Sequence, residues 1–161
     1  MKLWLITGLL LSGRVNRLIN FSLSVNVSLA IVANPDSVPQ FWCRLGGNLL
    51  KVNCDAAVKG NQADVACLVR DRSGSILDGF CKRVASGLSV LMVEALAVRE
   101  ACVFCLKAGI VEARIESDNA YVVAWCLKED GIPPWEISPV ICDIGSLAQS
   151  SSLFHGYSYI G

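Results

Sequence analysis

Three acidic residues in this 161-residue sequence stand where a folded protein more often has an apolar or small residue. Asp55 ends an alternating stretch, Glu94 lies within an apolar helical pattern, and Asp118 ends a second alternating stretch. Carboxylate oxygens and water are the ligands that Mg²⁺ prefers in proteins. Three carboxylates on three separate elements therefore predict a divalent-metal site.

Two of these acids also have simpler interpretations. Counted at 100° per residue, Glu94 lies in the middle of the apolar stripe of its helix, among Leu91, Val98, Ala101 and Cys105. A carboxylate there is paired, protonated or bound to a cation, because burying it bare costs several kcal/mol. Alternatively, Glu94 is an acid near the helix start that solvent still reaches. Asp118 precedes a helical pattern, so it either binds a metal or caps that helix.

The element that carries Asp55 is the first of three predicted strands. Alternation of apolar and polar residues predicts a strand at residues 49–57, and a short apolar run predicts a second strand at 63–70. Residues 75–83 return as a third strand, with turns at 59–61 and 71–74. In the first strand Lys51, Asn53 and Asp55 share one face. Strand, turn and strand at this spacing predict an antiparallel meander.

The second half of the chain alternates helices and strands. We expect a helix at residues 89–107, a strand at 111–117 and a helix at 120–128. A helix at 135–149 comes next, with Pro134 in its first turn, and residues 151–159 begin one more strand. This order predicts an α/β fold in which the meander continues into a parallel strand through a crossover helix.

The first 47 residues have a different character. Lys2 and the apolar run Leu3–Leu11 resemble a signal peptide and are too short for a membrane span. Asn20 and Asn26 begin glycosylation tripeptides, a pattern common by chance. Nothing in this segment pairs with the later part of the chain, so we expect residues 1–47 to be a non-domain segment and linker. The domain is then residues 48–161.

The net charge and the cysteines limit which binding partners and which cellular compartment are expected. The formal net charge is zero, which gives no support to strong nonspecific nucleic-acid binding. Eight cysteines are present, and six of them fall inside strand or helix patterns, where they act as small hydrophobes. Cys102 and Cys105 have C-x-x-C spacing without a second ligand pair for zinc. We therefore expect reduced cysteines and an intracellular protein, in the nucleus or cytoplasm.

Four blocks of residues resemble a known family. They are Lys51-Val52-Asn53-Cys54-Asp55-Ala56-Ala57, Leu68-Val69-Arg70-Asp71-Arg72-Ser73-Gly74, Glu94-Ala95-Leu96-Ala97-Val98-Arg99-Glu100-Ala101 and Ile115-Glu116-Ser117-Asp118. Their order and content resemble the plant ribonuclease H-like domain, a type 1 ribonuclease H family found in retroelement-derived polyproteins. The resemblance implies a mixed five-stranded sheet, with an antiparallel meander plus parallel strands, and flanking helices.

The resemblance also implies an activity. Members hydrolyse the RNA strand of RNA–DNA hybrids with Mg²⁺, or Mn²⁺ in its place. Asp55, Glu94 and Asp118 match the metal-binding and catalytic acids by position. Two such ions activate the attacking water and stabilise the leaving 3′-oxygen. The implied partner is an RNA–DNA hybrid or other nucleic acid, and we expect a monomer without stable membrane association.

The end of the sequence departs from the family pattern. Ser152-Leu153-Phe154-His155 resembles the start of the last block, so His155 is a weaker candidate for assisting catalysis, and as a strand-end residue it needs no such role. Ser158 stands where the family has arginine, and the family's fourth acid, which lies beyond this last strand, has no match before Gly161. We therefore expect weakened hydrolysis. Two alternatives stay open: a non-catalytic nucleic-acid-binding remnant of a retroelement, and a secreted protein.

Overall fold

A computed structural model describes residues 49–110, 113–128, 131–150 and 154–159. Of residues 149–150 and 154–159 it describes the backbone alone. The predicted N-terminal segment, residues 1–47, lies outside the described residues.

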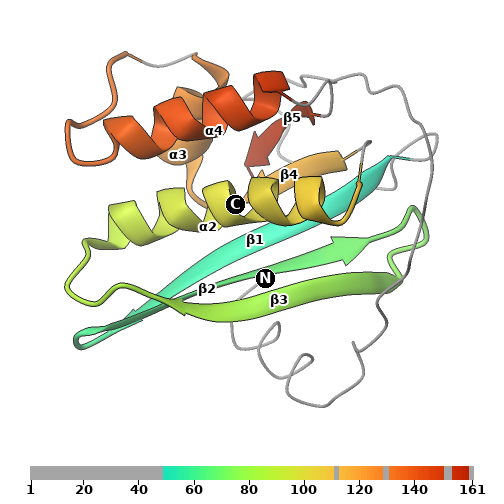
Figure 1. The fold of residues 1–161 in the computed structure, drawn as a ribbon, viewed down its shortest axis with the longest axis horizontal. Coiled ribbons are helices and arrows are strands. Elements are labelled where there is room, and N and C mark those ends of the chain that lie inside the picture. The colour runs from blue at the N-terminus through green and yellow to red at the C-terminus, as the bar shows by residue number, and fades with distance from the viewer. Residues whose placement is uncertain (1–48, 111–112, 129–130, 151–153, 160–161) are drawn as a thin grey trace.

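Five strands form one mixed sheet (Figure 1). The strands β1 (Leu50–Lys59), β2 (Gln62–Arg70) and β3 (Ile76–Val84) pair antiparallel as the predicted meander. The strand β4 (Ala113–Ser117) lies parallel to β1, and β5 (Phe154–Tyr159) lies parallel to β4. The strand order β3-β2-β1-β4-β5 places β1 in the centre, which confirms the predicted five-stranded sheet.

The first hairpin is tighter than the sequence predicted. Lys59 pairs with Gln62, so β1 continues two residues beyond Ala57 and the loop has two residues. Gly60 in that loop has φ +59°, a conformation that glycine adopts without steric cost.

Three helices lie on one face of the sheet (Figure 1). They are α2 (Val90–Lys107), α3 (Ala120–Leu127) and α4 (Ser138–Ser150). The helix α2 packs on β1 and β2, and α4 packs on α2. Alternate residues of β1 and β2 face α2 in the core. The strands contribute Val52, Cys54, Val65 and Cys67, and α2 contributes Val98, Ala101 and Cys102. The core therefore lies between the sheet and the helices.

The helix α4 begins three residues later than predicted. Residues 135–137 form a turn, in which the Ile137 N–H donates to the Pro134 carbonyl at 3.1 Å. A helix starting at Trp135 would place Pro139 in its interior, where proline lacks a donor and clashes with the carbonyl four residues earlier. The start at Ser138 puts Pro139 in the first turn, where no donor is needed.

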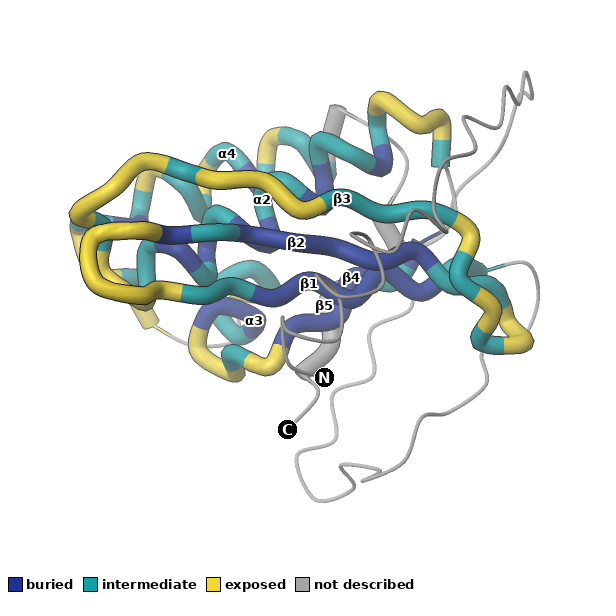
Figure 2. The backbone as a smooth tube through the Cα atoms, turned by 90° about the horizontal axis from the view of Figure 1, so that it is seen from below, coloured by how far each residue is buried: buried dark blue, intermediate teal, exposed yellow. Residues whose placement is uncertain are grey.

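Burial falls from the centre of the sheet to the β3 edge (Figure 2). The strands β1 and β2 are mostly buried, whereas Leu77, Cys81, Lys82 and Arg83 of β3 are exposed. Gly79 is required in β3, because a Cβ there would lie 2.4 Å from the Cys67 carbonyl oxygen.

The described cysteines are free thiols. Seven of the eight are described, and Cys43 lies outside the described residues. Burial raises the pKa of the Cys54 and Cys67 thiols well above the usual range, which keeps them protonated. Among the described helices, none has both the length and the apolar character that crossing a membrane requires.

Candidate metal centre

Asp55 and Asp118 are brought together by the register of two parallel strands. Asn53 of β1 lies beside Glu116 of β4 at the end of their ladder. Two residues further along each strand direction come Asp55 and Asp118. The carboxyl ends of adjacent parallel strands meet at one edge of a sheet, where ligands commonly bind. Asp55 is buried and Asp118 is exposed, so the pair extends from the core to solvent.

Glu94 reaches the same place from the helix layer. The side chain of Ser89 caps α2 by accepting from the Met92 N–H at 3.2 Å. This cap fixes where the helix starts, and Glu94 falls in its second turn, half-buried on the face toward the sheet. The first turn of α2 contains no acidic residue. The alternative interpretation of Glu94 as a helix-start acid is therefore wrong.

The capping interpretation of Asp118 is also wrong. The N-cap of α3 is Asn119, whose side-chain oxygen accepts from the Val122 N–H at 3.1 Å. Asp118 lies one residue before the cap, so its carboxylate is available for another role.

The three acids form one cluster. One carboxylate oxygen from each of Asp55, Glu94 and Asp118 lies within 4.8 Å of the other two. The structure thus brings together all three residues that the sequence singled out. Among the described residues this is the one group of three or more histidine, cysteine or acidic side chains close enough to share a metal ion.

The electrostatics of the cluster fit a cation. Burial, then the negative charges of Asp118 and Asp55, raise the pKa of Glu94 to about 8. Its Oε2 atom is buried and has no hydrogen-bond partner among the described residues. Such an oxygen is stabilised either by a proton or by a cation. Because all three donors are carboxylates, the cluster suits a hard ion such as Mg²⁺ or Mn²⁺.

A buried polar network supports the two strands behind the cluster. The Lys51 ammonium lies 2.9 Å from Glu116 Oε1, and Asn53 Nδ2 donates to Glu116 Oε2 at 2.7 Å. All three side chains are buried. These contacts fix the register of β1 against β4, and that register sets Asp55 beside Asp118. Glu116 was not among the residues singled out from the sequence, although the polar residues at alternate positions of both strands were a visible signal.

His155 belongs to β5, and its side chain lies outside the described residues. The structure therefore does not test its predicted minor role.

Comparison with known proteins identifies the family. Residues 53–152 match the family described as "Reverse transcriptase-like". A search among curated protein sequences finds no match. Among solved structures, one similar protein is an N-terminal RNase H domain from Mycobacterium tuberculosis, studied as a fusion with maltose-binding protein. Its TM-score is 0.60 at 15% sequence identity, and the match covers 70% of this chain and 86% of that one.

Two further RNase H structures are similar. RNase H1 from the halophilic archaeon Halobacterium salinarum has a TM-score of 0.60 at 15% identity, covering 68% of this chain and 82% of that one. LC11-RNase H1, isolated from compost by a metagenomic approach, was solved with an RNA/DNA hybrid. It has a TM-score of 0.60 at 12% identity, with the same coverage of 68% and 82%. At these identities the likeness establishes the fold. The chain belongs to the reverse transcriptase-like family and has the RNase H fold.

Proposed function

We propose that this chain is a divalent-metal-dependent endoribonuclease that hydrolyses the RNA strand of RNA–DNA hybrids. The observation that carries the proposal is the cluster of Asp55, Glu94 and Asp118, with carboxylate oxygens within 4.8 Å of one another. The cluster lies inside the region that matches the family. A structural neighbour bound to an RNA/DNA hybrid supports the choice of substrate, which in turn favours the nucleus or cytoplasm as the compartment.

Each acid has a distinct part in the proposed metal centre. When bound, Mg²⁺ or Mn²⁺ ions in such a site activate a water and stabilise the leaving 3′-oxygen. Asp55 is held in place on β1, because the Ala56 N–H donates to its Oδ1 at 2.9 Å. Glu94 is carried by α2, whose packing on β1 fixes its distance from Asp55. Asp118 is exposed, so it lies on the side from which a phosphodiester can approach.

A cleavage assay tests the proposal. A labelled RNA–DNA hybrid is incubated with the chain in Mg²⁺, in Mn²⁺ and with a chelator, and the products are resolved by length. We expect cleavage of the RNA strand that depends on the metal. Asp55→Asn, Glu94→Gln and Asp118→Asn each remove one charged ligand and keep the side-chain shape. Each is expected to lower the rate on the order of 10²-fold or more.

The matched control is Asp64→Asn. Asp64 forms an ion pair with Arg83 on the meander, and its loss costs little because both side chains are partly exposed. This variant should cleave at the wild-type rate. Full activity in chelator, or in all three acid variants, would contradict the proposal. Hybrid binding without cleavage in any divalent ion would instead support the alternative, a non-catalytic nucleic-acid-binding remnant.

A further inference from the structure

The outer edge of β3 is an unpaired strand edge. The strand β3 is the terminal strand of the sheet, and among the described residues no strand pairs with its outer side. It is nine residues long and contains no proline, which would block pairing. Its C-terminal part, residues 81–83, is exposed, and Figure 2 shows this end of the strand in yellow. Exposed edges of this length pair readily with another strand unless charge or shape prevents it.

The sequence of β3 is complementary to itself when read antiparallel about Phe80. In that register the opposite pairs within the regular part of β3 are Asp78 with Lys82, Gly79 with Cys81, and Phe80 with Phe80. We propose that two copies of this chain associate through β3 in this register, to form one continuous ten-stranded sheet. The interface is two-fold symmetric, so each complementary pair occurs twice.

Charge complementarity identifies the partner as a second copy. Asp78 lies opposite Lys82 of the other chain on both sides of the central Phe80 pair, and opposite charges at directly facing positions favour pairing. Charges on an edge normally oppose self-association. Here their order along β3 favours it in this one register.

The pairs that decide the register lie on the helix side of the sheet. Asp78, Phe80 and Lys82 pair with Val69, Cys67 and Val65 of β2, which all belong to the core between sheet and helices. Both charged pairs and both Phe80 rings of the assembled dimer therefore lie on the face that carries α2.

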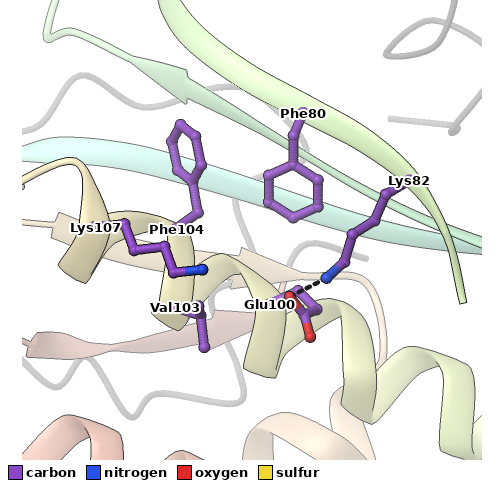
Figure 3. A pocket seen from close by; sticks show the side chains of 6 residues that line it. All are labelled: Phe80, Lys82, Glu100, Val103, Phe104 and Lys107. Carbon is purple, nitrogen blue, oxygen red and sulfur yellow. Dashed lines mark hydrogen bonds and ion pairs between the residues drawn. The ribbon is translucent and has the colours of Figure 1, made fainter.

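A hollow at this edge lies where the second copy would pack. It has a volume of about 170 Å³ and lies between β3 and the C-terminal half of α2, lined by Phe80, Lys82, Glu100, Val103, Phe104 and Lys107 (Figure 3). The ring centroids of Phe80 and Phe104, which form part of its wall, lie 5.5 Å apart. Lys82 contacts Glu100 here, and 46% of the Lys82 side chain stays exposed. That ammonium can therefore contact Asp78 of a second copy and keep Glu100 as a neighbour.

Charge-reversal variants test both the dimer and its register. The molar mass of the whole chain is measured by sedimentation and light scattering over a range of concentrations, and circular dichroism checks folding. We expect a dimer that dissociates on dilution. Asp78→Lys alone places lysine opposite lysine, and Lys82→Asp alone places aspartate opposite aspartate. Each reversal should weaken the dimer about tenfold or more.

A mixture of the two variants gives the decisive result. In a heterodimer of Asp78→Lys with Lys82→Asp, both facing pairs are again of opposite charge, so a 1:1 mixture should restore the dimer. Lys59→Asp, at the exposed end of β1, changes the charge as much as Lys82→Asp and should leave the dimer intact. A monomer at all concentrations would overturn the proposal. So would a dimer that neither single variant weakens, or folded variants whose mixture does not associate.

Discussion

The backbone positions of Asp55, Glu94 and Asp118 bring their three carboxylates close enough to share a metal ion. Asp118 is free for a metal because Asn119 caps α3 in its place. Glu94 faces two other carboxylates because α2 begins at Val90 and so turns this residue toward the sheet. The identities of these residues indicated the cluster from the sequence. The buried contact of Glu116 with Lys51 was not predicted, because the relative register of β1 and β4 is a tertiary property.

The raised pKa of Glu94 makes the metal-free protein sensitive to pH. The pKa rises from 4.5 to about 8 on folding, so the folded chain holds this proton more tightly than the unfolded chain does. Its contribution to stability is fully present below the unfolded pKa, near 4.5, and is lost as pH rises toward 8. In chelator, the free energy of unfolding should fall between pH 5 and pH 8.5, by on the order of 1–2 kcal/mol after allowance for solvent screening.

Urea unfolding in chelator measures this dependence. Glu94→Gln cannot ionise, so the variant should lose most of the fall between pH 5 and pH 8.5 and be more stable than the wild type at the higher pH. The opposite result, a Glu94→Gln variant with the full wild-type slope, would show that the three carboxylates do not repel one another in the folded chain.

At the scale of elements, capping residues and apolar spacing predicted most helix and strand boundaries. They missed a boundary where one residue, Pro139, opposes the helix that the apolar spacing favours. Ser89 at the start of α2 and Gly109 after its end are recognisable caps, and the helix runs between them as expected. The apolar spacing after Trp135 also looked helical. The missing donor of Pro139 shifted that start to Ser138. The pairing of β4 with both β1 and β5 is known only from the strand order of the folded sheet, because the periodicity of a strand does not determine which strands lie beside it.

The C-terminal end of α3 offers a stabilising substitution. Lys128 is the C-cap and has φ +60°, a left-handed conformation that glycine adopts without steric cost. Lys128→Gly should therefore raise the free energy of unfolding by roughly 0.5–1 kcal/mol, measured by urea unfolding, since it relieves this strain. Lys107→Gly is the matched control. It lies at the end of α2, where the backbone is helical, and should destabilise by about 1 kcal/mol. Equal losses at both positions would contradict the argument.

At the scale of the whole molecule, the proposed metal centre joins the two layers of the fold. Asp55 and Asp118 belong to the sheet, and Glu94 belongs to the helix layer. The family match covers residues 53–152, and we propose residues 48–161 as the domain that contains it. The sequence led us to expect a monomer. The self-complementary edge of β3 leads us to propose a dimer, since an edge is recognised only after the strand order is known.

Joining the layers through a metal predicts that Mg²⁺ stabilises the folded chain. The three ligands lie far apart in the sequence and meet only on folding, so an ion that they share binds the folded state alone. At a free Mg²⁺ concentration ten times the dissociation constant, the gain is about 1.4 kcal/mol, or roughly 3–6 °C in Tm. Thermal unfolding in Mg²⁺, against NaCl at matched ionic strength, measures it. Asp118→Asn removes an exposed ligand and should fold normally while losing most of the shift. If Asp118→Asn and the wild type gained the same Tm in Mg²⁺, the ion would be acting elsewhere on the chain.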